Sequence, residues 1–323
     1  MTFSNSRHEI LMFSSAIPAE LTRYRIPGSQ VSCASGEYGR LLLRELDSPS
    51  CPIHQTVYQA GKKSWFNIRD DGPFFFTCIA LQHDWRMETK DLGAIHLKEG
   101  QFNIVYLPQF DLRSPYEGGK EYITLTLNYS IETLQEMAPW FPRLTAFLEK
   151  VQAGQPAILL EEHGRLTKEI QVTIYKILHC SPLTPSRRRS FDLLVNTLLF
   201  HLLLQSVQRQ PASTYTHHEI DGIHAARDMI CKNIRYHFII REIARRVGMN
   251  EFKLKNGFRE LFGNGVYEYL RTERMQEAGT LLSDPGRSIK EVAALTGYKS
   301  VTSFIKAFKK KFHRTPGAFR KKT

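Results

Sequence analysis

Cysteine is scarce in this 323-residue chain, and its few copies follow no binding motif. The sequence has five cysteines, an odd number, and no two of them stand in a C-x-x-C pair. A disulfide scaffold would need paired cysteines and a structural zinc site would need closely spaced ones, so both are disfavoured. Free thiols fit a reducing compartment, and we predict a cytoplasmic protein that carries no metal and no other cofactor.

Long apolar runs are also missing. The longest lies near 198–204, where His201 interrupts it, and it is far shorter than the ~20 apolar residues of a membrane-spanning helix. The first residues, MTFSNSRHEILMF, lack the basic start and the apolar core of a secretory signal. We therefore predict that no membrane is among the partners of this protein.

Acidic residues are in short supply in one region only. Residues 1–217 contain 22 basic and 21 acidic residues, whereas residues 218–323 contain 22 basic residues and only 11 acidic ones. Nearly all of the formal net charge of +12 therefore lies in the last third. Such asymmetry indicates a segment that binds a polyanion. The alternative is a basic solubilising tail, but apolar residues recur here at helical spacing, which predicts a folded domain.

The first part of the chain is predicted to be β-rich. Between about residues 38 and 129, short runs rich in aromatic and branched residues alternate with turn signals such as Asp70-Asp71-Gly72-Pro73. No helix-like crossover separates the runs, which favours an antiparallel barrel or sandwich over a parallel sheet. The predicted strands are Tyr38–Leu46, Ile53–Tyr58, Ser64–Ile68, Phe74–Gln82, Gln101–Leu107 and Tyr122–Asn128.

Helices are predicted after residue 130. They cover residues 131–137, 140–151 and 166–178, with Ser130 and Thr167 as N-terminal caps. A longer helix at 190–208 is apolar on more than one face, so it either forms a homodimer or buries both faces within one chain. The predicted organisation is a β-rich domain at 1–130, a helical and dimerisation segment at 131–209, a polar linker at 210–217 and a basic domain at 218–323.

The basic domain contains an internal repeat. Residues 241–263 and 290–313 share the same order of apolar, small and basic residues. In each copy a short helix carries Ile243-Ala244 or Val292-Ala293, and a glycine, Gly248 or Gly297, permits a left-handed helix stop. Asn250 or Ser300 then caps a second helix that presents apolar residues at i, i+4 and i+8. Each copy is therefore predicted to be a helix-turn-helix unit.

The other face of each second helix is polar and basic, as a helix that enters the major groove of DNA requires. A helical bridge at 267–282 would hold the two second helices at neighbouring groove segments, ~34 Å apart, on double-stranded DNA. The predicted contact residues are Lys253, Lys255, Asn256 and Arg259 in the first copy, and Thr302, Ser303, Lys306 and Lys309 in the second.

The string AALTGYKSVTSFIKAFKKKFHRTPGAFR, which ends at Arg320, resembles the C-terminal signature of AraC/XylS-type bacterial transcription regulators. The resemblance covers about a third of the chain. Its marks are Gly297-Tyr298, Ala307-Phe308-Lys309, Thr315-Pro316 and Phe319-Arg320. The segment MNEFKLKNGFRELFGNGVYEYLRTERMQEA is similar to the subgroup that responds to ferric siderophores.

The resemblance implies an α+β protein in which an N-terminal antiparallel β (cupin-like) sensor with flanking helices precedes an all-α double helix-turn-helix DNA-binding domain. It implies RNA polymerase as a partner and a small-molecule effector, such as an iron chelate. It adds two DNA contacts, Phe252 and Val301, to Lys255, Asn256, Thr302, Ser303 and Lys306. Two residues depart from the family pattern: Val301 stands where a polar reader is common, and His313 stands where glycine usually follows the second helix. We expect the end of that helix to be shaped differently.

The effector contacts are predicted less directly. Trp85-Arg86 combines an aromatic ring with a cation and suits an anionic ligand, unless the pair is core aromatic and surface arginine. The histidines at 54, 83 and 96 include no H-x-H pair, so a cupin-type metal site is not predicted.

The combined prediction is a sequence-specific, ligand-responsive transcription regulator that is not an enzyme. One alternative is an enzyme like the DNA-repair alkyltransferases, which place a reactive cysteine beside a similar DNA-binding unit; no cysteine here has their P-C-H-R context. The other alternative is a nucleoid-binding protein that binds DNA without sequence preference.

Overall fold

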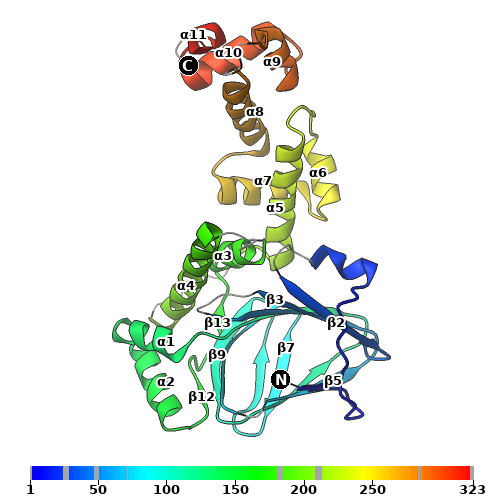
Figure 1. The fold of residues 1–323 in the computed structure, drawn as a ribbon, viewed down its shortest axis with the longest axis vertical. Helices are drawn as coiled ribbons and strands as arrows, with labels where there is room; N and C mark the ends of the chain where they lie inside the picture. Colours follow the sequence, from blue (N-terminus) through cyan, green and yellow to red (C-terminus); the bar gives the residue numbers. More distant parts are fainter. Residues whose placement is uncertain are drawn as a thin grey trace. The chain divides into compact units, whose positions relative to one another are not determined.

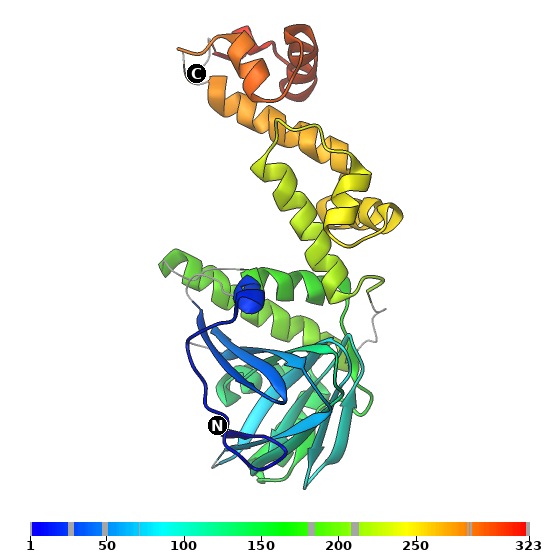
Figure 2. The ribbon, with the colours of Figure 1, turned by 90° about the vertical axis from the view of Figure 1, so that its right-hand side faces the viewer.

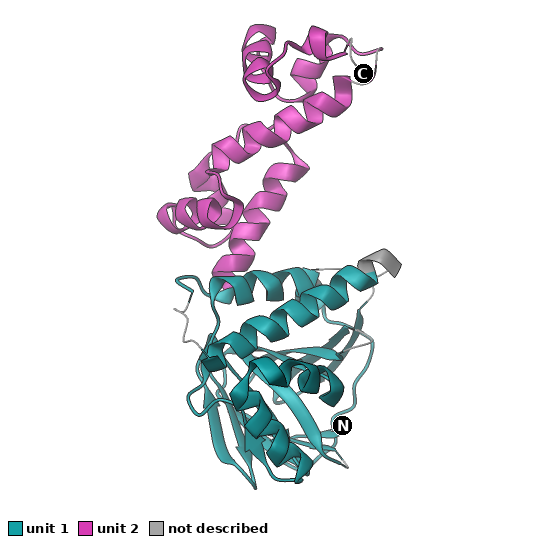
Figure 3. Cartoon of the chain, turned by 90° about the vertical axis from the view of Figure 1, so that its left-hand side faces the viewer, with its two compact units in different colours: residues 1–217 teal, residues 218–323 magenta. Residues whose placement is uncertain are grey.

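The computed structural model describes residues 2–24, 29–46, 51–70, 72–179, 185–207, 213–282, 284 and 286–320. The chain divides into two compact units, unit 1 at residues 1–217 and unit 2 at residues 218–323, which Figure 3 draws in teal and magenta. Cys180 and residues 210–212 of the predicted linker lie outside the described residues. The rest of that linker is held on unit 1, because the Ser213 N–H donates to the Leu166 carbonyl at 3.0 Å.

Unit 1 is built on two antiparallel sheets that together form a barrel-like structure (Figure 2). The smaller sheet has the strand order β1-β5-β10-β7-β8, and the larger has the order β12-β9-β6-β11-β4-β3-β2, with β13 also paired to β9. All strand pairs of the described residues are antiparallel, which confirms the predicted fold class of this part. The strands are β1 (Thr2–Ser4), β2 (Gln30–Gly36), β3 (Gly39–Leu46), β4 (Ile53–Ala60), β5 (Ser64–Asp70), β6 (Phe74–Gln82), β7 (Trp85–Thr89), β8 (Gly93–Leu97), β9 (Gln101–Leu107), β10 (Phe110–Tyr116), β11 (Glu121–Leu127), β12 (Ala157–Ile158) and β13 (Gly164–Arg165).

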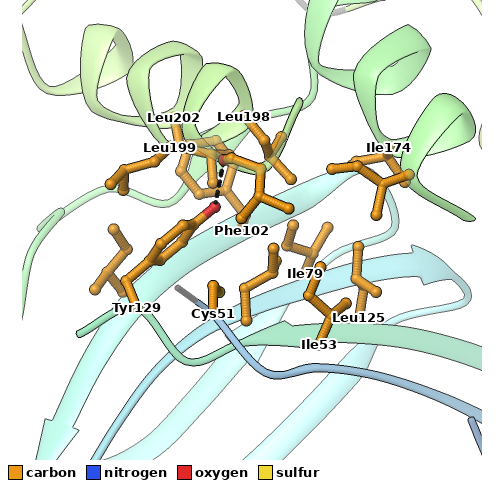
Figure 4. Close-up of a cluster of buried hydrophobic side chains, with 14 of the residues drawn as sticks. Cys51, Ile53, Ile79, Phe102, Leu125, Tyr129, Ile174, Leu198, Leu199 and Leu202 are labelled. Atoms are coloured by element: carbon orange, nitrogen blue, oxygen red, sulfur yellow. Dashed lines mark hydrogen bonds between the residues drawn. The ribbon is translucent and has the colours of Figure 1, made fainter. Parts of the chain in front are cut away.

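Four helices cover one side of the larger sheet (Figures 1 and 2): α1 (Ile131–Met137), α2 (Pro142–Gln152), α3 (Lys168–His179) and α4 (Pro185–Val207). The predicted caps are confirmed, since Ser130 Oγ accepts from the Thr133 N–H and Thr167 Oγ1 accepts from the Ile170 N–H. In Figure 4, Leu198, Leu199 and Leu202 of α4 lie above Ile53, Ile79 and Leu125 of the sheet. Each fully buried leucine or isoleucine of this kind contributes about 1.5–3 kcal/mol.

Two polar side chains, Tyr129 and Arg44, connect helices α3 and α4 to the rest of unit 1 by hydrogen bonds. The hydroxyl of Tyr129 donates to the Val195 carbonyl of α4 at 3.2 Å (Figure 4). The buried guanidinium of Arg44, on β3, donates to the Leu178 carbonyl near the end of α3 at 2.9 Å and to the Tyr24 carbonyl at 3.1 Å. A buried cation needs such acceptors, so strand β3 and helix α3 are expected to keep their relative position.

The expectation that no segment is apolar enough to cross a membrane was wrong by length and composition, because residues 188–207 of α4 meet that criterion. The burial of this helix gives a different reason for its apolar character. Phe191, Val195, Leu198, Leu199, Leu202 and Leu203 are all fully buried in the core of unit 1. Packing on its own domain therefore accounts for one face of α4.

Unit 2 consists of helices around two small apolar centres. They are α5 (His217–Lys232, which starts at the unit boundary), α6 (Ile240–Arg246), α7 (Glu251–Phe262), α8 (Val266–Leu282), α9 (Ile289–Leu295), α10 (Val301–Phe312) and α11 (Pro316–Arg320). Leu254 and Phe258 of α7 are buried in the first centre, and Phe304 and Phe308 of α10 are buried in the second. Helix α8 is the predicted bridge, with Met275 and Ala278 buried. Two helix-turn-helix units are thus confirmed.

The turns of the two helix-turn-helix units contain the predicted left-handed glycines and helix caps. Gly248 and Gly297 have φ of 67° and 80°, in the left-handed region where glycine carries no steric cost. The Asn250 side chain accepts from the Lys253 N–H at 2.8 Å, and Ser300 Oγ accepts from the Ser303 N–H at 3.1 Å. The caps therefore fix where α7 and α10 begin.

The end of α10 corrects one expectation. His313 adopts φ 57° and ψ 16°, and its N–H donates to the Lys309 carbonyl, so the helix ends in the same left-handed cap that Gly263 forms at the end of α7. The shape is retained although the residue differs. A residue with a side chain loses about 1 kcal/mol of stability in the left-handed conformation, and His313 has this cost.

Replacing His313 with glycine should therefore stabilise unit 2 by about 0.5–1 kcal/mol, because glycine adopts this cap without the steric cost. Urea unfolding followed by circular dichroism would measure the change. Unfolding at the same or a lower urea concentration than the wild type would contradict the expectation.

Candidate functional site

The predicted reading faces are the exposed faces of α7 and α10. On α7, Phe252 is 74% exposed at the first turn, and Lys253, Lys255 and Arg259 are exposed with it, whereas Asn256 is half-buried. On α10, the residues at 302, 303, 306 and 309 are all exposed; 302, 306 and 309 follow the i, i+4, i+7 spacing of one helix face, and 303 lies beside them. Val301 is half-buried and packs on the second apolar centre. Its side chain therefore helps to seat the start of α10.

The lysines of the two faces differ in their partners. Lys253 Nζ donates to Glu219 of α5, and Lys255 Nζ lies 3.4 Å from Glu251 one turn away on α7. Within the residues that the structure describes, Lys306 and Lys309 have no such carboxylate partner. The cations of α10 are therefore available to an anionic ligand without first leaving an ion pair.

Charge is also divided unequally between the two halves of unit 2. Residues 284–323 contain eleven basic residues and two acidic ones, whereas residues 218–283 contain eleven basic and nine acidic residues. A nucleic-acid backbone attracts net positive charge, so the half that contains α10 should contribute most of the sequence-independent attraction.

One arginine of the bridge ties the two halves together. Arg274 of α8 is largely buried, and its Nε donates to the Ile234 carbonyl at 2.7 Å while Nη2 donates to the Tyr236 carbonyl at 3.2 Å. Its guanidinium also lies 5.7 Å from the ring of Tyr298, in the turn between α9 and α10. Burial lowers the pKa of Arg274 from its usual value. The side chain connects the segment after α5 with the turn of the second helix-turn-helix. It therefore helps to fix the spacing between the two helix-turn-helix motifs of unit 2.

Unit 1 contains a cavity of about 480 Å³ between its two sheets. This size is typical of sites for small organic ligands. Its wall includes Phe66, Trp85 and Phe110 on the smaller sheet and Glu45, His54 and Thr124 on the larger one. The cavity is large enough to hold a small organic molecule.

The two predicted effector contacts separate at this cavity. Trp85 lines it and donates from Nε1 to Ser114 Oγ at 3.0 Å. Arg86, the next residue on β7, is exposed on the opposite face and pairs with Glu88 at 3.0 Å. Because neighbouring residues of a strand point to opposite faces, the two side chains cannot meet one ligand inside the barrel.

The three histidines considered for a metal site are dispersed. His54 lines the cavity with its Nδ1 3.7 Å from Glu45, His83 has its Nδ1 2.9 Å from the Glu121 carbonyl, and His96 lies 3.4 Å from Asp84. Among the described residues, no group of three or more metal-ligating side chains occurs.

Comparison with known proteins agrees with the geometry of unit 2. The family described as "Helix-turn-helix domain" matches residues 243–322. The chain is similar to the regulatory protein PchR of Pseudomonas aeruginosa, with 31% identity over 163 residues. Unit 2 is a helix-turn-helix domain of the AraC type. The matched segment covers 48% of this chain and 51% of PchR, so the chain spans about half the length of that relative.

Two further proteins are similar to about a third of the chain. The xylose operon regulatory protein of Escherichia coli K12 is 29% identical over 101 residues, which are 31% of this chain and 25% of that protein. The solved structure of a DNA-binding transcriptional dual regulator from E. coli K-12 has 30% identity and a TM-score of 0.30, and covers 32% of this chain and 97% of that one.

Several residues of these sites escaped the sequence prediction. Glu45, Thr124 and Arg274 were not singled out as parts of a site, and His54 was considered only as a metal ligand, because their roles depend on partners from other strands or helices. The available signal was alternation, since Leu41, Leu43 and Glu45 point to the same side of β3 and all three line the cavity.

Proposed function

We propose that this protein is a sequence-specific transcription regulator that binds double-stranded DNA through unit 2 and a small-molecule effector through unit 1. The observation that carries the proposal is the pair of capped helix-turn-helix units on one bridging helix, each with an exposed polar face. In this proposal, α7 and α10 read base edges in the major groove, and the lysines near the end of α10 contact phosphates.

The direct test is selection of binding sites from a random DNA library with the full chain, followed by measurement of affinity for the selected and for scrambled sequences. A regulator should prefer its site by about 10³-fold or more. A ratio near one would favour the nucleoid-binding alternative instead. Transcription with purified RNA polymerase, the further partner that the family resemblance implies, would then show the sign of regulation as a rise or fall of the transcript.

The phosphate contacts have a separate signature. Changing Lys309 and Lys310 together to alanine should weaken binding to selected and scrambled DNA alike. Each lost phosphate contact reduces the slope of log affinity against log salt by about 0.9, so the double variant should lose about 2 from that slope. Affinity measured from 50 to 300 mM salt would test this; a loss confined to one base pair of the site would contradict it.

The enzyme alternative finds no support in the described cysteines. Cys33, Cys51 and Cys78 are buried, and burial raises the pKa of the Cys78 thiol to about 12. Cys231 is exposed, yet desolvation raises its pKa too. A thiol of raised pKa is a poor nucleophile at neutral pH. A mass increase on any cysteine after incubation with alkylated DNA would revive the alternative.

The cavity of unit 1 is proposed as the effector site, and the family resemblance suggests an iron chelate as its ligand. A ligand can alter regulation only if its affinity differs between two states of the protein that differ in DNA binding. The proposed regulator acts in the cytoplasm, where both its DNA and its effector would be met.

A homodimer through α4 is the proposed assembly. Leu193, Phe200 and Val207 are 68%, 44% and 62% exposed, and they are seven residues apart, so they form one exposed stripe, in which Phe200 also touches the core ring of Phe141. The half-buried Leu204, which packs partly against the core, stands at the intermediate position of a heptad. Such spacing is typical of the seam of a two-stranded coiled coil.

Changing Leu193 and Phe200 together to glutamate should convert the dimer to a monomer, because charges in the seam would lose their hydration on pairing. Light scattering coupled to size exclusion measures the mass directly. Met12, which is 84% exposed elsewhere, provides the matched apolar-to-glutamate control and should leave the mass unchanged. A wild-type chain that is monomeric at micromolar concentration would contradict the assembly.

A further inference from the structure

The two walls of the unit 1 cavity differ in chemistry. The smaller sheet contributes mainly aromatic and aliphatic side chains, among them Phe66, Trp85 and Phe110, together with the carboxylate of Asp70 at the end of β5. Trp85 already donates its only N–H to Ser114, so toward a ligand it offers ring surface and no free donor. A ligand placed against this wall would therefore gain stacking and apolar contact, but few hydrogen bonds.

The larger sheet contributes a polar band in register across three strands. Glu45 of β3 pairs with His54 of β4, which in turn pairs with Thr126 of β11. In the adjacent row, Thr56 of β4 pairs with Thr124 of β11. All five side chains line the cavity. A ligand between the sheets would thus meet aromatic rings on one side and hydroxyl, imidazole and carboxylate groups on the other.

The net charge of the polar band is negative. Glu45 is 53% exposed and lies 3.7 Å from His54 Nδ1. Burial lowers the pKa of His54, so the imidazole is neutral at neutral pH and leaves the charge of Glu45 uncompensated. Among the described lining residues there is no lysine or arginine that could compensate it. Enclosing an anion here would be costly, whereas a cation is favoured by the carboxylate and by the aromatic faces.

We propose that this cavity selects an aromatic compound that carries an amine, with its ring against Phe66, Trp85 and Phe110 and its ammonium group at Glu45, and that it rejects anions of the same shape. The inference rests on the proposed function only in naming this ligand as the effector. Among the ferric chelates that the family resemblance suggests, this ligand class favours those that are neutral or cationic. The anionic ligand expected from Trp85-Arg86 is replaced by a ligand with an amine.

A matched series of three indoles tests the selection with the full chain. Tryptamine carries an ammonium group, indole-3-ethanol is neutral, and indole-3-acetate is an anion with the same ring. At equal concentration, tryptamine should raise the melting temperature most and indole-3-ethanol less, because a ligand that binds the folded state stabilises it. Indole-3-acetate should bind at least tenfold more weakly than tryptamine in calorimetric titration.

Glu45→Gln supplies the second arm of the test. It should remove the advantage of tryptamine over indole-3-ethanol, while Glu88→Gln, a carboxylate on the outer face of β7, should leave that advantage intact. The order of the three probes on the wild type tests the proposal even if the Glu45 variant folds poorly. Equal shifts with indole-3-acetate and tryptamine, or no shift with any probe, would overturn it.

Rejection of the aromatic amine as ligand can be distinguished from rejection of the proposed regulator function. Site-specific DNA binding without any probe depends on unit 2, so specific binding with no indole binding would reject the ligand class alone. Indole binding in the predicted order without specific DNA binding would instead reject the regulator and leave the ligand class standing.

Discussion

Replacing Gly297 with alanine should destabilise unit 2 by about 2–4 kcal/mol and abolish specific DNA binding at ordinary temperatures. Gly297 has φ +80°, and an added Cβ would lie 2.9 Å from both the Cα and the carbonyl oxygen of Arg235 and 2.9 Å from Nη2 of Arg274. The left-handed backbone costs an alanine about 1 kcal/mol, and the overlap with rigid backbone adds the rest. The turn between α9 and α10 would have to move away from Arg274.

The two units can be followed separately in this experiment. The three tryptophans of the chain all lie in unit 1, at positions 65, 85 and 140, so their fluorescence reports unit 1 while circular dichroism at 222 nm also reports unit 2. The variant should shift the circular dichroism transition in urea and leave the fluorescence transition in place.

Gly263→Ala is the matched control, because Gly263 has φ +76° but nothing lies within 4 Å of an added Cβ. It should lose only about 1 kcal/mol, from backbone conformation alone. Equal losses in the two variants would mean that the close approach of Arg235 and Arg274 does not limit residue 297.

The repeat in unit 2 was predictable because its determinants are local. A cap residue, a glycine and apolar residues at helical spacing act within a few positions of each other, and Asn250, Gly248 and Phe258 stand where the repeat predicts them. His313 shows the limit of such reasoning: its neighbours impose the left-handed cap although the residue itself does not favour it.

The strands of unit 1 were predicted where their composition is typical. The six predicted runs correspond to β3, β4, β5, β6, β9 and β11, but β2, β7, β8 and β10 were not predicted. Strand β2 (QVSCASG) is rich in small polar residues, β7 (WRMET) alternates with charges, and β10 (FDLRSPY) contains a proline. Their place in a sheet is decided by pairing with β3, β8 and β5, which composition does not reveal.

The cavity could not be predicted because it depends on strand register. Glu45 and His54 are nine residues apart and become partners only when β3 and β4 pair with Leu46 opposite Ile53. A shift of β4 by one residue would turn His54 to the other face of the sheet, away from Glu45. The same alternation separates Trp85 from Arg86, which are adjacent in sequence and lie on opposite faces.

Changing Lys306 to alanine should weaken binding to the selected DNA site by about 1–3 kcal/mol, which corresponds to a loss of about 5- to 150-fold. Lys306 is exposed in the middle of α10, one turn beyond Thr302 and Ser303, and has no ion-pair partner among the described residues. A residue that reads a base edge should also lose discrimination at one position of the site, whereas binding to scrambled DNA should change little.

The comparison with Lys255 makes this prediction specific to α10. Lys255→Ala also removes a cation, but Lys255 is held by Glu251, so DNA must first compete with that pair and the loss should be smaller. Lys290→Ala, an exposed lysine on α9, is the control for charge alone. Fluorescence anisotropy with every single-base variant of the selected site would separate the three lysines. If the Lys306 variant and the wild type bind selected and scrambled DNA equally, α10 does not read the sequence, and the specificity must come from α7.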